Sequence, residues 1–209
     1  MAVGGLLGRF GRRVCSGRWL RALGSLACQA IVRGVVLMIR CIAFDCFGTV
    51  FDMSTVPRDE IKAYVDHVRK NDFSPFRFPQ SWWNLKCHPD AADGINKLQQ
   101  AGFVCVTLSN GSVELLEQVS LNGGIIWHHF VDLMVHGVYK PHQDAYRTIE
   151  KDLGFRPSEC LMVTANPTFG DLEGAAAIGM KSQVIRHGFP ETIVELANLL
   201  TTKPWWQNA

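Results

Sequence analysis

The chain has 209 residues, of which 47% are hydrophobic and 19% charged, as in an ordinary globular protein with one well-buried core. Residues 1–40 hold seven arginines and no acidic residue, whereas residues 41–209 hold 14 Lys and Arg against 19 Asp and Glu. The mildly acidic body gives no electrostatic case for a nucleic-acid-binding protein.

Residues 1–37 are a basic N-terminal extension that allows three interpretations. Their Gly, Arg and Ser content without acids is typical of an organelle presequence, which would place the protein in the mitochondrial matrix. The apolar stretch 22–32 after the first arginines also resembles a secretory signal, although Arg33 interrupts it as a membrane span. We favour the third interpretation, in which a compact domain begins at Met38. The seven cysteines include no C-x-x-C pair, which indicates reduced thiols and a cytoplasmic protein.

Strands alternate with helices over residues 38–209, which predicts one Rossmann-like α/β domain with a doubly wound parallel sheet. The apolar runs predict strands at 39–44, 103–108, within 125–139, at 160–164 and at 182–185. The helical spacing of apolar residues predicts helices within 55–70 and at 90–100, 113–121, 143–153, 172–178 and 191–200. Residues 71–85 are rich in aromatic side chains and are expected to be irregular.

Asp45 directly follows the apolar run 39–44. It therefore lies at the carboxyl end of a buried strand, where open α/β sheets place their ligands. Gly48 permits a sharp turn there, and Thr49 returns a side-chain oxygen towards the same place. A carboxylate in this position can act as a nucleophile and form a covalent ester or an acyl phosphate.

Residues 41–52 resemble the first motif of the haloacid dehalogenase superfamily, and three further segments follow in the order that this family requires. The segment 104–112 resembles the second motif, 138–141 the third, and 161–166 with the residues just after it the fourth. The resemblance covers residues 38–190. The residues that it singles out in the later motifs are Ser109, Asn110, Lys140, Thr164, Asn166 and Asp171.

The resemblance implies that Asp45 is the nucleophile. Thr49, Ser109 and Asn110 would hydrogen-bond the nucleophile and the anionic group of the substrate. Lys140 would offset the charges of Asp45, Asp171 and the substrate, and Asp171 would orient Lys140 or the attacking water. Two unit charges about 4 Å apart interact by about 4 kcal/mol at an effective dielectric near 20, so crowded carboxylates need such a cation.

Phe47 bears on the class of reaction. Phosphatases of this superfamily usually carry a second Asp there, which protonates the leaving alkoxide and contributes roughly 10²–10⁴-fold. A halide leaves without a proton, so Phe47 favours the L-2-haloacid dehalogenase subgroup. Tyr146 falls where that subgroup has its active-site tyrosine, and Thr164 replaces a serine.

Asn166 points in the same direction, because magnesium-dependent members usually have an acid at that position. We therefore expect no cofactor. If the enzyme were instead magnesium-dependent, Asp45 and Asp171 would bind the ion through their carboxylate oxygens.

The sequence also departs from the subgroup. Gly170 stands where the subgroup has a tryptophan before its last Asp, and no arginine aligns with the one that contacts the halide, although Arg58, Arg69 and Arg77 are available. The helical cap is reduced to about residues 53–87, so the site should be open or closed by the partner subunit of a homodimer. The aromatic residues of this segment either cover the edge of the core or line a pocket.

These features predict a hydrolase that dehalogenates a small anionic 2-haloacid through an ester of Asp45. One alternative is a phosphatase for a small phosphorylated metabolite with a good leaving group. The other is a binding or regulatory protein of low activity with the same fold. Neither a nucleic acid nor a membrane is expected as a partner.

Overall fold

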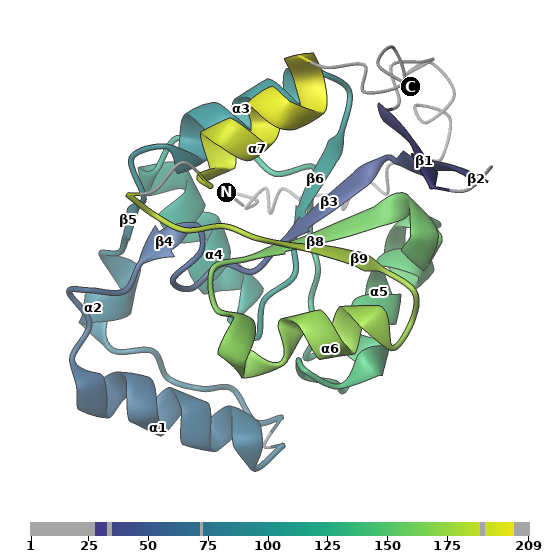
Figure 1. Cartoon of the computed structure of the whole chain (residues 1–209). Helices are drawn as coiled ribbons and strands as arrows, with labels where there is room; N and C mark the ends of the chain where they lie inside the picture. The colour runs from purple at the N-terminus through teal and green to yellow at the C-terminus, as the bar shows by residue number, and fades with distance from the viewer. Residues whose placement is uncertain (1–27, 33–34, 72, 189–190, 203–209) are drawn as a thin grey trace, which may run out of the picture.

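The structure, a computed structural model, describes residues 28–32, 35–71, 73–188 and 191–202 (Figure 1). Its centre is a five-stranded sheet in which all neighbouring strands run parallel, in the order β7-β6-β3-β8-β9. The predicted parallel α/β sheet is therefore confirmed. The five strands are β3 (Cys41–Phe44), β6 (Val104–Thr107), β7 (His129–Phe130), β8 (Cys160–Thr164) and β9 (Lys181–Val184).

Strand β3 is the middle strand and is buried on both faces, because helices cover both sides of the sheet. Ile42 and Phe44 pack into one hydrophobic cluster, with side chains of α3 (Ala91–Gln100), α4 (Val113–Asn122) and α7 (Ile193–Thr202). Cys41 and Ala43 pack into the other, with side chains of α5 (Gln143–Leu153) and α6 (Asp171–Ala176). Figure 1 shows α3 with α7 on one side of the sheet and α5 with α6 on the other. The unbroken apolar run of β3 follows from this double burial.

The expected helices and strands of the sheet agree with the structure to within a few residues at their ends. The segment before α3 differs more. Residues 80–83 were expected to be irregular but form a short helix, α2 (Gln80–Trp83), which Pro79 precedes. A helix of four residues is too short to show a periodic pattern in sequence. After the first motif the chain forms a strand, β4 (Phe51–Asp52), which pairs with β5 (Lys86–Cys87) in a two-stranded antiparallel ribbon.

The reduced cap consists of α1 (Arg58–Arg69), α2 and the chain between them. In Figure 1 this part lies apart from the two helical layers, beside the end of the sheet where β3 enters the β4 turn. No helix among the described residues is long and apolar enough to cross a membrane.

Residue 39 does not belong to the strand predicted at 39–44, because β2 (Val35–Ile39) pairs with β1 (Cys28–Val32) in a separate antiparallel ribbon. Strand β3 begins only at Cys41, after the exposed Arg40. The interpretations of the N-terminal extension concern residues 1–27 above all, and these lie outside the described residues.

A chain that begins at Met38 should fold, because β1 and β2 pair only with each other among the described strands and lie outside the five-stranded sheet. We expect its thermal unfolding midpoint and its activity to match those of the full chain. Circular dichroism melts of both forms would test this. An unfolded or insoluble product from Met38, beside a soluble full chain, would contradict the prediction.

Candidate active site

The candidate site lies where the carboxyl ends of three adjacent parallel strands meet. Strand β3 pairs Phe44 with Thr107 of β6 and with Val163 of β8, so the three strands end level with one another. The Asp45 amide continues the ladder by donating to the Val163 carbonyl at 2.9 Å. Level strand ends bring the first, second and fourth motifs together although 121 residues separate Asp45 from Asn166.

Lys140 joins two carboxylates in the middle of the site. Its ammonium donates to Asp45 Oδ1 at 2.9 Å and to Asp171 Oδ2 at 3.2 Å, and it lies 3.0 Å from Asp171 Oδ1. The three residues are buried, with 9% of Asp45, 7% of Lys140 and 3% of Asp171 exposed. The structure thus places Lys140 in contact with both acids, and the three groups together carry a formal charge of −1.

Burial and charge act in opposite directions on these groups. Burial raises the pKa of Asp45, the Lys140 ammonium opposes that rise, and the Asp171 carboxylate adds to it. Burial by itself would lower the pKa of Lys140, but the two carboxylates outweigh it and raise the pKa above its usual value. Lys140 therefore stays charged, and its ammonium offsets the negative charge of the two carboxylates beside it.

The second oxygen of the Asp45 carboxylate is held by two further donors. Thr49 Oγ1 donates to Asp45 Oδ2 at 2.9 Å, and Asn166 Nδ2 donates to the same oxygen at 3.3 Å. Asn166 Nδ2 also donates to the Phe47 carbonyl at 3.0 Å. Both neighbours are acceptors, which fixes the amide with its nitrogen towards Asp45. Gly48 has a φ of 81°, and a side chain there would press against the Asn166 amide.

Asn110 and Ser109 follow β6, at the start of α4. The Asn110 side chain makes two hydrogen bonds with the backbone of Lys140: Nδ2 donates to the carbonyl at 3.0 Å, and Oδ1 accepts from the amide at 2.8 Å. Asn110 therefore positions the loop that carries the lysine. Ser109 is 1% exposed and lines the cavity in front of Asp45.

Two of the predicted substrate-binding residues lie behind the cavity. Tyr146 is fully buried, and its hydroxyl donates to Asp171 Oδ1 at 2.8 Å. Thr164 is fully buried as well, and its hydroxyl accepts from the Asn166 amide at 3.0 Å. Neither lines the cavity at Asp45. Their geometry favours positioning roles, Tyr146 for Asp171 and Thr164 for the loop of Asn166.

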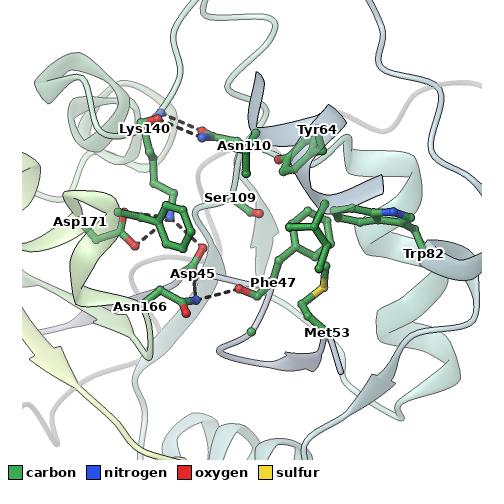
Figure 2. Close-up of a pocket in the computed structure, with 14 residues that line it drawn as sticks. Asp45, Phe47, Met53, Tyr64, Trp82, Ser109, Asn110, Lys140, Asn166 and Asp171 are labelled. Atoms are coloured by element: carbon green, nitrogen blue, oxygen red, sulfur yellow. Dashed lines mark hydrogen bonds and ion pairs between the residues drawn. The ribbon is translucent and has the colours of Figure 1, made fainter. Parts of the chain in front are cut away.

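The cavity at Asp45 has a volume of about 220 Å³ and one aromatic wall (Figure 2). Phe47 meets the Trp82 ring edge-on at 5.0 Å and the Tyr64 ring at 5.8 Å between ring centroids. Of the two readings of the aromatic residues in the cap, Trp82 thus supports the one in which they line a pocket. The complete lining is Asp45, Phe47, Gly48, Met53, Ile61, Tyr64, Val65, Trp82, Ser109, Asn110, Lys140, Asn166, Phe169 and Asp171.

Sequence reasoning placed Tyr64 only by its helical spacing with Ile61 and Val65 and assigned it no role. That spacing shows that the three share one face of α1, but it does not say what the face meets. Arg58, Arg69 and Arg77 are all exposed, and none of them lines the cavity at Asp45. The cavity therefore holds one cationic side chain, Lys140, among its described lining residues.

The donor set at Asp45 does not suit magnesium. This ion prefers oxygen ligands in near-octahedral geometry, usually carboxylates and waters. Here the Lys140 ammonium and the Asn166 amide nitrogen occupy the sides of the Asp45 carboxylate that a metal would need. No group of three or more His, Cys, Asp or Glu within the described ranges could hold a metal ion.

The family model of the haloacid dehalogenase-like hydrolases matches residues 74–179. The chain belongs to this family. The match covers the second, third and fourth motifs, which supply Ser109, Asn110, Lys140 and Asp171.

Relatives with known names agree with this family. Haloacetate dehalogenase H-2 of Moraxella sp. (strain B) is 32% identical over 119 residues, which cover 56% of this chain and 52% of the relative. (S)-2-haloacid dehalogenase of Xanthobacter autotrophicus is 25% identical over 188 residues, which cover 68% of this chain and 73% of the relative. The chain thus spans about half the length of the first and about three quarters of the second.

Solved structures show the same fold. A structure of the L-2-haloacid dehalogenase from Xanthobacter autotrophicus with chloropropionic acid covalently bound has a TM-score of 0.60 at 22% identity, and the match covers 79% of this chain and 83% of that one. Another dehalogenase structure has a TM-score of 0.68 at 21% identity, covering 83% of this chain and all of that one.

Replacing Lys140 by Met should destabilise the protein at neutral pH by about 3–5 kcal/mol, because it leaves two buried carboxylates without their cation. The pKa of Asp45 in the folded variant should then rise further above its value in the unfolded chain. Between these two pKa values the folded variant binds more protons than the unfolded chain, so its free energy of unfolding falls as the pH rises.

Urea unfolding at about pH 5 and about pH 8 would measure this. We expect the loss of unfolding free energy, relative to the wild-type chain, to be smaller at the acidic pH. Lys62→Met is a matched control, since the Lys62 side chain is 76% exposed in a surface pair with Asp66. If Lys140→Met loses the same unfolding free energy at both pH values, Lys140 is not the cation that offsets the buried carboxylates.

Proposed function

We propose that the protein hydrolyses a small 2-haloacid to the 2-hydroxy acid, with Asp45 as the nucleophile. One Asp45 oxygen attacks the carbon that carries the halogen, the carbon–halogen bond breaks, and the halide leaves with the bonding electrons. The Asp45 carboxylate becomes a neutral ester. Lys140, Thr49 and Asn166 hold the attacking carboxylate in place through the hydrogen bonds described above.

In the second step water attacks the carbonyl carbon of the Asp45 ester. Asp171 is the other carboxylate among the lining residues and can take the proton of this water. The bond between the Asp45 carbonyl carbon and the bridging oxygen breaks, and the proton passes from Asp171 to that oxygen, which leaves as the hydroxyl of the 2-hydroxy acid. The second proton of the water is released to solvent, which restores the Asp45 carboxylate. Tyr146 and Lys140 orient Asp171 for this transfer through their hydrogen bonds to its two oxygens.

Phe47 is the observation that carries the choice of reaction. It stands in the cavity where a phosphatase would need an acid to protonate a leaving alkoxide. The other carboxylate of the lining, Asp171, accepts hydrogen bonds from Lys140 and Tyr146. A halide needs no proton to leave, so this set of groups favours dehalogenation over cleavage of an ordinary phosphate ester.

The size of the cavity and the named relatives support the proposed substrate. A volume of about 220 Å³ is below the roughly 300–1,000 Å³ of sites that hold drug-sized ligands, which favours a substrate of few atoms. Both named relatives are dehalogenases of small acids, haloacetate in one case and 2-haloacids in the other. Ser109 and Asn110, at the N-terminal end of α4, would receive the carboxylate of the acid.

A single turnover of 2-chloropropionate in ¹⁸O-labelled water should put the label into Asp45, because water attacks the carbonyl carbon of its ester. Mass spectrometry of the Asp45 peptide would detect this. Transfer of a phosphoryl group would instead leave Asp45 unlabelled and label the phosphate. Asp45→Asn should abolish turnover without unfolding the chain, since the amide keeps the shape and removes the charge.

Treatment with EDTA should leave dehalogenation unchanged, because nitrogen donors flank the Asp45 carboxylate where a magnesium ion would bind. Rates with 2-haloacids and with phosphate esters, each with EDTA and with added magnesium, would check this. Activity that disappears in EDTA and returns with magnesium would favour the phosphatase alternative.

A further inference from the structure

Tyr64 carries a buried hydroxyl that the proposed reaction has not used. The residue is 8% exposed, and its oxygen has no hydrogen-bond partner among the described residues. It lines the cavity at Asp45, and in Figure 2 its hydroxyl points towards Ser109 and Asn110. A buried hydroxyl without a partner costs roughly 1–3 kcal/mol, so a water molecule or a ligand has to complete its hydrogen bonding.

Tyr64 lies on the aromatic side of the cavity, away from Lys140 and Asp171. Figure 2 shows Lys140 and Asp171 on one side of Asp45 and the aromatic wall on the other. Lys140 is bonded directly to Asp45 and to Asp171, which leaves the aromatic side for the substrate. Displacement at carbon is in line, so the halide leaves on the face of the carbon opposite Asp45, towards the wall that Tyr64 and Trp82 form.

We propose that Tyr64 is a catalytic residue whose hydroxyl donates a hydrogen bond to the departing halide. This proposal rests on the proposed function. The halide gains a full negative charge, and the one cationic side chain of the described lining, Lys140, is already paired with Asp45 and Asp171. Tyr64 Oη–H supplies the partial positive charge there, and it is preorganised because the rings of Phe47, Phe78 and Trp82 pack around it.

The protonation of Tyr64 suits this role. Burial raises the pKa of the Tyr64 hydroxyl well above its usual value, and the charge of Asp45 adds to the rise. The hydroxyl therefore keeps its proton at neutral pH, where it can act as a hydrogen-bond donor.

The Tyr64 ring has a separate, steric role that decides which variant tests the hydroxyl. Tyr64 and Asn110 are shared between this cavity and a second one of about 380 Å³, which Arg77, Trp83 and Tyr139 help to line. Replacement by Ala would join the two cavities and change binding for steric reasons. Tyr64→Phe keeps the wall and removes only the donor.

The test measures bromide binding by the line width of the ⁸¹Br NMR signal, in the Asp45→Asn background. The amide at position 45 is neutral, as the Asp45 ester is after the halide has left. Bromide binding to this variant therefore imitates the state after displacement, and no turnover is needed. Adding Tyr64→Phe should lower the bromide affinity about 10- to 100-fold, the value for a hydrogen bond to a charged group. Tyr139→Phe, which removes a hydroxyl from the second cavity only, should leave it unchanged.

A second measurement compares kcat/KM for 2-chloro- and 2-bromopropionate in the chain with an intact Asp45. Chloride is the poorer leaving group and the stronger acceptor, so Tyr64→Phe should slow the chloro acid more than the bromo acid. If Tyr64→Phe changes neither the bromide affinity nor the ratio of kcat/KM for the chloro acid to kcat/KM for the bromo acid, the proposed role of Tyr64 is wrong. A wild-type chain that turns over neither acid would refute the proposed function, while the bromide titration would still decide whether Tyr64 binds the anion.

Discussion

The ion-pair cluster of Lys140 with Asp45 and Asp171 is the constraint on which the rest of the site depends. Two buried carboxylates at one point repel each other strongly, and only a cation between them makes the arrangement stable. The surrounding hydrogen bonds fix each member of the cluster. Asn110 holds the backbone of Lys140, and Tyr146 holds Asp171, while the donors at Oδ2 hold Asp45.

The same cluster prepares the chemistry. Burial disfavours the charged form of Asp45, as its raised pKa shows, so the carboxylate is held ionised in surroundings that solvate it poorly. In the proposed reaction, formation of the ester would remove that charge and relieve the repulsion with Asp171. The aromatic side chains of the wall line the cavity in front of Asp45, and Phe47 supplies no acid there. Burial and charge thus both favour displacement at carbon.

The short cap contributes large side chains to the cavity. Helices α1 and α2 supply Tyr64 and Trp82, and aromatic side chains bury roughly 150–250 Å² each. They pack edge-on against Phe47, which the turn after β3 supplies, so cap and sheet form the aromatic wall together. In our proposal the Tyr64 hydroxyl of α1 is the donor for the departing halide, and it carries a partial positive charge rather than a full one.

The sequence by itself determined the parallel sheet and the position of each motif. An apolar run such as 41–44 can be buried on both faces only inside a helix-covered sheet, and the residue after such a run must lie at the sheet's carboxyl edge. Asp45, Ser109 and Asn166 could therefore be placed together from local patterns. The tertiary structure alone decided that Tyr146 contacts Asp171 behind the cavity and that Tyr64 faces into it. Those facts depend on how α5 and α1 pack against distant parts of the chain, and helical spacing defines a face without defining what it meets.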